Sequence, residues 1–77
     1  MKTVRTYREL DTVEIPEDVP GLEVARGDTG VISAVWDGGR MLDVEVPREG
    51  GTSAGFVDLE VLPDGSTKVV GHSRLSS

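Results

Sequence analysis

The stretch ARGDTGVISAVW, residues 25–36, joins a turn containing two glycines to the longest apolar run of the chain. Gly27 and Gly30 lack a Cβ and can adopt positive φ angles, so they suit a tight entry into a strand. The residues that follow are β-branched or small, which packed strands favour. The sequence therefore predicts a strand over residues 29–36.

Apolar residues occur at both odd and even positions of this strand, and so on both of its faces. This pattern predicts a central or sharply bent strand that packs against two layers. Simple alternation places Ile32, Ala34 and Trp36 on one face and Val31 and Val35 on the other. The residues DGGR at 37–40 have the chemistry of a hairpin turn that returns the chain toward this strand.

The chain before this strand predicts one strand and one long loop. Residues 10–15 alternate, with Val13 and Ile15 expected inward, and Pro16 ends the strand because it has no N–H to donate. Residues 16–27 contain two prolines and a Pro-Gly turn signal, which argue against a helix. We expect Leu22 and Val24 in this loop to fold back onto the core.

The chain after it predicts further short strands. Residues 41–47 alternate, with Leu42, Val44 and Val46 inward. We expect a fourth strand over 53–57 with Ala54 and Phe56 inward, then a 3₁₀ turn and a short closing strand within 58–62. Turn signals occupy 48–52 and 63–66, and residues 68–70 can add an edge strand.

Length and spacing predict one small all-β domain. The chain has 77 residues, and short strands recur every 8–12 residues, as in a small sandwich or barrel. Closure into a barrel would remove exposed edges. We expect the domain over residues 10–70, an N-terminal arm over 1–9 and a flexible tail over 71–77.

Composition restricts the classes of function. The chain has no cysteine, which excludes disulfides and thiolate chemistry and fits a cytoplasmic protein. No apolar run is long enough to span a membrane, and residues 1–8 lack the apolar segment of a secretory signal. The net charge of −6 argues against nucleic acid as a partner and favours docking to a basic protein.

Two resemblances bear on the fold. The long loop between the first two strands resembles that of SH3-like barrels, and Gly27-x-x-Gly30-x-Ile32 resembles the KOW motif of some ribosomal proteins and transcription elongation factors. The segments LDTV at 10–13, GL at 21–22, GDTGVI at 27–32 and DVEV at 43–46 resemble a family of small bacterial proteins without assigned function. These resemblances imply a five-stranded SH3-like barrel and carry over no catalytic residue.

Candidate site residues point to a protein partner rather than to catalysis. Trp36 ends a strand beside a turn, where part of its ring should stay exposed, and exposed aromatics often anchor interfaces. A satellite-core role is the competing interpretation. The candidate partner-binding residues are Trp36, Glu17, Asp18, Glu23 and Arg40. For the loop carboxylates the competing interpretation is simple solvation.

No enzyme, metal or cofactor is predicted. Asp43 and Glu45 could bind a cation or a basic peptide, but a solvated strand face explains them more simply. The lone histidine, His72, lies in the expected tail without a positioned partner, so it is not a candidate base.

Three functions are compatible with these observations. The first is a non-enzymatic SH3-like module that binds a protein through the long loop and the Trp36 turn. The second is a KOW-type contact to RNA or the ribosome through Lys2, Arg5 and Arg8. The third is an accessory barrel of a larger enzyme complex, by analogy of fold alone.

Overall fold

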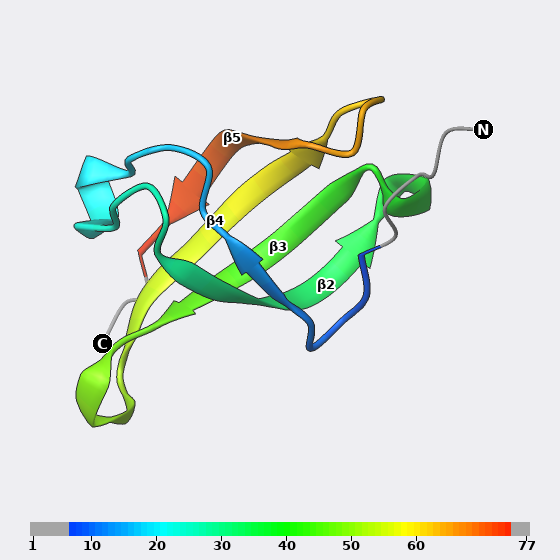
Figure 1. Cartoon of the computed structure of the whole chain (residues 1–77). Helices are drawn as coiled ribbons and strands as arrows, with labels where there is room; N and C mark the ends of the chain where they lie inside the picture. The colour runs from blue at the N-terminus through cyan, green and yellow to red at the C-terminus, as the bar shows by residue number, and fades with distance from the viewer. Residues whose placement is uncertain (1–6, 75–77) are drawn as a thin grey trace.

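The computed structural model describes residues 7–74, which form a single five-stranded antiparallel sheet (Figure 1). The strands follow one another in the order β1-β2-β3-β4-β5. Their bounds are Thr12–Glu14 for β1, Thr29–Trp36 for β2, Met41–Pro47 for β3, Ser53–Val61 for β4 and Thr67–Ser73 for β5. Three 3₁₀ turns lie between them: η1 at Pro20–Leu22, η2 at Asp37–Gly39 and η3 at Glu49–Gly51. The predicted all-β class is confirmed.

The core lies between the inner face of the sheet and the long loop that connects β1 with β2. Leu42, Val44 and Val46 alternate inward from β3, as predicted, and none is more than 3% exposed. Leu22 and Val24 fold back over this face from the loop and are equally buried, which confirms their predicted role as lids. Across the described residues no helix is long and apolar enough to span a membrane.

The two glycines at the start of β2 have different roles. Gly27 has a φ of +93°, so the prediction of a turn residue with positive φ is correct there. Gly30 lies within β2 without a positive φ, so that part of the prediction is wrong. A Cβ on Gly30 would lie 2.3 Å from Cγ1 of Val44 and 3.1 Å from the carbonyl oxygen of Glu45. Gly30 is therefore needed for close packing of β2 against β3.

A β-bulge changes which residues of β2 face the core. The register of β2 against β3 shifts between Ile32 and Ala34, so Ser33 is an extra residue. Ile32 and Val35 consequently face inward, whereas Ala34 and Trp36 face outward. The prediction that Ile32, Ala34 and Trp36 share one face is wrong, because simple alternation does not anticipate the bulge.

β4 is one continuous strand, where a strand, a 3₁₀ turn and a closing strand were expected. Gly55, Val57 and Leu59 are buried in unbroken alternation, and the residues between them face outward. The predicted 3₁₀ turn within residues 58–62 is therefore wrong. Phe56 pairs with Glu45 on the outer face and lies outside the core, so its predicted inward orientation is also wrong.

β5 extends past the predicted limit of the domain. Gly71, His72 and Ser73 pair with β4 and belong to the sheet, although they were expected in a flexible tail. At the other end, Tyr7 packs against the core and donates a hydrogen bond from its hydroxyl to the Gly65 carbonyl oxygen, 2.7 Å away. The sheet is not closed, because no backbone ladder pairs β1 with β5 within residues 7–74.

Candidate docking face

The outer face of the sheet carries five apolar side chains that do not contribute to the core. The strand register places them on the same side of β2, β3 and β4, and none is packed against the core cluster. They are Val31, Ala34, Trp36, Met41 and Phe56. Trp36 is 50% exposed and the others are partly exposed. Among residues 7–74 no other element covers this side of the sheet, and we call it the docking face.

Four carboxylates lie among these apolar side chains. They alternate outward along the two central strands, two on β3 and two on β4, and none is fully exposed. They are Asp43, Glu45, Asp58 and Glu60. The docking face therefore combines apolar and anionic groups, and Lys68 on β5 is its only cation within the five strands.

Asp43 and Asp58 lie directly opposite each other on β3 and β4. Partial burial raises the pKa of the Asp58 carboxyl above its usual value of 3.8, and a hydrogen bond and charge repulsion from Asp43 raise that pKa further. His72 acts in the opposite direction. Two like charges held in this position oppose each other unless a proton or a cation lies nearby.

Neighbouring residues hold this pair in place. Nε1 of Trp36 donates a hydrogen bond to Oδ1 of Asp43 at 3.4 Å, and Oγ of Ser33 donates to the Asp43 carbonyl oxygen at 3.2 Å. The Asp58 carboxylate lies close to Gly71 on β5, where an added Cβ would be 3.2 Å from Oδ2 of Asp58. Gly71, which has no side chain, therefore leaves room for the Asp58 carboxylate.

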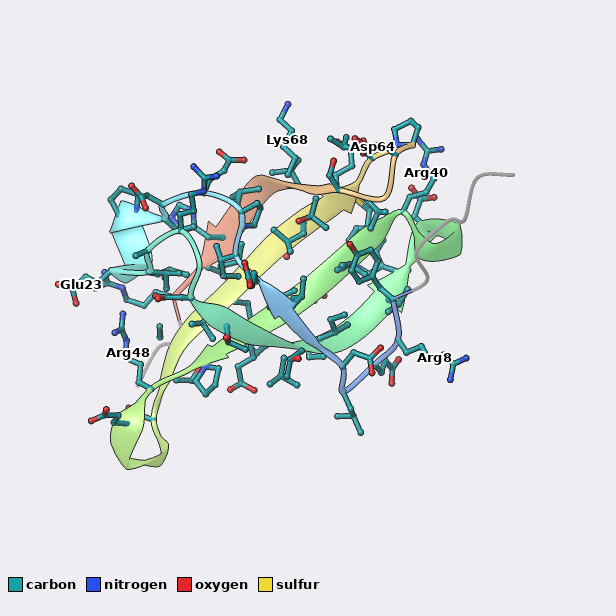
Figure 2. The ribbon with its side chains drawn as sticks, in the orientation of Figure 1. Arg8, Glu23, Arg40, Arg48, Asp64 and Lys68 are labelled. Carbon is teal, nitrogen blue, oxygen red and sulfur yellow. The ribbon has the colours of Figure 1, made fainter. Side chains whose placement is uncertain are left out.

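The sequence-predicted binding residues do not form one surface. Trp36 and Arg40 flank η2 at one end of β2, and the long loop with Glu17, Asp18 and Glu23 precedes the other end. Seven residue steps along β2 separate these ends by about 23 Å. Figure 2 shows Glu23 at one end of the sheet and Arg40 at the other.

The three loop carboxylates have local structural contacts. Glu17 accepts a hydrogen bond from the Val69 amide at 3.0 Å, and Asp18 accepts one from the Arg26 amide at 2.8 Å. Glu23 adopts a left-handed conformation with a φ of +58° at the end of η1. Glu17 and Asp18 each hold a backbone amide, so neither is an unengaged carboxylate on a docking rim.

Sequence reasoning missed most of the docking face. It treated Phe56 as core, and it did not consider Met41 or connect Asp43 with Asp58. The detectable signal was the unbroken alternation of residues 53–61, which places Phe56, Asp58 and Glu60 on the side opposite Val57 and Leu59.

The described residues contain no cluster of three or more histidine, aspartate and glutamate side chains arranged to hold a metal ion. His72 lies on β5 above Gly21, where an added Cβ would approach its Nε2 to 2.8 Å. Comparisons with protein-family models, with curated proteins and with solved structures found no match to this chain.

Proposed function

We propose that this chain is a non-enzymatic protein-interaction module and that its docking face binds a partner offering apolar and basic groups. The observation that carries the proposal is the uncovered side of the sheet, where Trp36, Met41 and Phe56 lie beside carboxylates. Aromatic side chains supply much of the binding energy at protein interfaces. The four carboxylates favour a basic partner through complementary charge.

We further propose that the fold is a partly open relative of the SH3-like barrel. The support is a five-stranded antiparallel meander with a long loop between its first two strands. The difference lies in β4 and β5, which form one long hairpin around residues 62–66. In this proposal, barrel closure is incomplete between β1 and β5.

Variants of the docking face test the function. We suggest immobilising the chain, exposing it to a host-cell extract and comparing the captured proteins for Trp36→Thr, Phe56→Thr and wild type. Leu10→Ser is the matched control, because Leu10 is 82% exposed and lies outside the docking face. We expect a partner that is retained by wild type and L10S but lost from both docking-face variants.

The proposal would be overturned if W36T and F56T captured the same proteins as wild type. It would also be overturned if wild type captured no protein. Capture that disappears after ribonuclease treatment would favour the KOW-type alternative instead. That alternative rests on Lys2 and Arg5, which lie outside the described residues, and on Arg8, which points away from the sheet in Figure 2.

A further inference from the structure

Within residues 7–74, the edge of β1 opposite β2 has no strand partner, and its backbone groups point away from the sheet. The Ile15 amide donates to the Asp28 carbonyl oxygen at 2.8 Å, and the same register continues along β1 to the pair Val13 and Gly30. Hydrogen-bonded and non-bonded pairs alternate in an antiparallel ladder. The backbone N–H and C=O groups of Thr12 and Glu14 therefore face the edge opposite β2.

The free edge of β5 is arranged in the same way. The Leu62 amide donates to the Ser66 carbonyl oxygen at 2.8 Å, and the register continues to Val61 with Thr67 and Leu59 with Val69. Alternation directs the backbone groups of Thr67 and Val69 outward. The hydrogen bond from the Val69 amide to Glu17 confirms this orientation.

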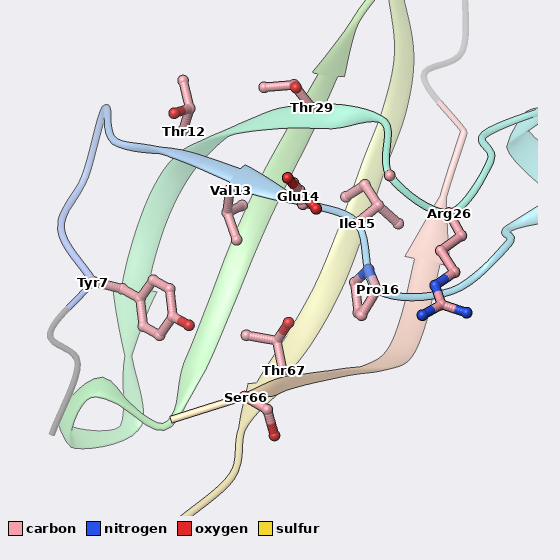
Figure 3. A pocket seen from close by; sticks show the side chains of 11 residues that line it. Tyr7, Thr12, Val13, Glu14, Ile15, Pro16, Arg26, Thr29, Ser66 and Thr67 are labelled. Atoms are coloured by element: carbon pink, nitrogen blue, oxygen red, sulfur yellow. The ribbon is translucent and has the colours of Figure 1, made fainter. Parts of the chain in front are cut away.

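Both edges line one open pocket of about 650 Å³, shown in Figure 3. Residues 12–16 form one side and residues 66–67 the other, and the lining is completed by Tyr7, Arg26, Gly27 and Thr29. We call this region between β1 and β5 the seam. Unpaired strand edges are ready templates for another strand.

Side chains, not backbone pairs, bridge the two ends of the seam. Tyr7 reaches Gly65 at one end, and Glu17 reaches Val69 at the other. A full tyrosine side chain spans the first gap, so the main chains there are farther apart than the about 4.8 Å of paired strands. From the first bridge to the second, the residue numbers rise on both sides, from Tyr7 to Glu17 and from Gly65 to Val69. β1 and β5 therefore run parallel. A strand between them could pair antiparallel with both.

The charge of the seam favours a cationic occupant. The segment 9–18, which contains β1 and its extensions, has five carboxylates and no lysine or arginine: Glu9, Asp11, Glu14, Glu17 and Asp18. Among the described residues that line the pocket, Arg26 is the only cation. An extended segment with lysine or arginine at alternate positions would complement this excess of negative charge.

We propose that the seam binds an extended, cationic segment of a partner protein as a sixth strand. The segment pairs with the outward-facing backbone groups of Thr12, Glu14 and Thr67 and directs its apolar side chains toward Val13. It presents its basic side chains to Glu14 on β1 and to the carboxylates of the adjoining residues. This site is separate from the docking face, so either proposal can fail without the other.

The test uses the full chain and a synthetic peptide, acetyl-Val-Lys-Val-Lys-Val-Lys-amide. We expect backbone amide resonances of Thr12, Glu14 and Thr67 to shift on titration and their hydrogen exchange to slow. A peptide N-methylated at alternate residues loses half of its backbone donors. We expect its affinity to be at least about tenfold lower. Replacing lysine with glutamate should abolish binding.

Two variants separate the seam from the docking face. Thr67→Pro removes an outward-facing N–H from an edge strand, where proline is tolerated, and should weaken peptide binding. W36T should leave the peptide affinity unchanged. Absence of shifts at the three seam amides, equal binding of the N-methylated peptide, or shifts confined to the docking face would each overturn the proposal.

Discussion

The indole of Trp36 donates a hydrogen bond to the Asp43 carboxylate, which itself lies opposite Asp58 across the β3–β4 ladder. An exposed aromatic ring and a pair of like charges are thus joined on the outer face of the sheet. Neither arrangement strengthens the core, since Trp36 is half exposed and the two carboxylates repel each other. We propose that this combination serves binding rather than folding.

Replacing Asp58 with asparagine should stabilise the protein at neutral pH. The pKa of Asp58 is raised in the folded state, so the folded chain binds a proton more tightly than the unfolded chain does. The free energy of unfolding therefore falls as pH rises from the usual 3.8 through the raised pKa. We expect D58N to gain about 0.5 kcal/mol at pH 7, the usual size of a cross-strand charge effect.

Urea unfolding at several pH values measures this effect. The gain from D58N should vanish below the usual carboxyl pKa, where aspartate is protonated in both states. Glu60→Gln is the control, because Glu60 lies opposite Lys68 and should gain nothing. An equal gain for E60Q would show that general surface charge, rather than the Asp43–Asp58 pair, sets the stability.

Gly30→Ala should destabilise the protein by about 2 kcal/mol, because the new methyl group overlaps Val44 and the backbone of β3. Gly21→Ala is the matched control among glycines without a positive φ. The atom nearest its added Cβ is Nε2 of His72, at the tip of an exposed side chain that can move away. Thermal unfolding compares the two, and equal losses would contradict the role assigned to Gly30.

Arg48 connects the β3–β4 hairpin to the long loop, so its removal should loosen that loop. Its Nη2 donates to the carbonyl oxygens of Leu22 at 2.5 Å and Glu23 at 2.9 Å. We expect Arg48→Ala to cost about 1.5 kcal/mol, as for hydrogen bonds from a charged donor. The exposed Arg40 gives the control variant R40A, for which chemical denaturation should show a change below about 0.5 kcal/mol.

Glu17→Ala should release the Val69 amide on the edge of β5. The carboxylate of Glu17 accepts that hydrogen bond across the seam, and no backbone partner replaces it within the described part of the chain. We expect hydrogen exchange at Val69 to become faster, while exchange at the core residue Val57 stays slow. The control Glu49→Ala, in the exposed η3 turn, should leave the exchange rate of the Val69 amide unchanged. An unchanged rate in E17A would contradict the hydrogen bond between Glu17 and Val69.

The alternation of polar and apolar residues, together with the turn residues between the alternating segments, was enough to predict an all-β chain. It located β2 and β3 at their observed residues, the turn at 37–40 and the burial of Leu42, Val44 and Val46. These features depend on period-two patterns and on turn residues, which are local properties. The continuity of residues 53–61 is equally local, because Val57, Leu59 and Val61 continue the alternation, but a 3₁₀ turn was predicted within 58–62.

The sequence by itself determined β2, β3, the loop lids and the excess of negative charge, because each follows from residue type and spacing. The tertiary structure decided where Trp36 points, since a single bulged residue reverses the faces of β2. It also decided that Asp43 meets Asp58 and that β1 and β5 stay apart, because strand register and closure depend on contacts between residues distant in the chain.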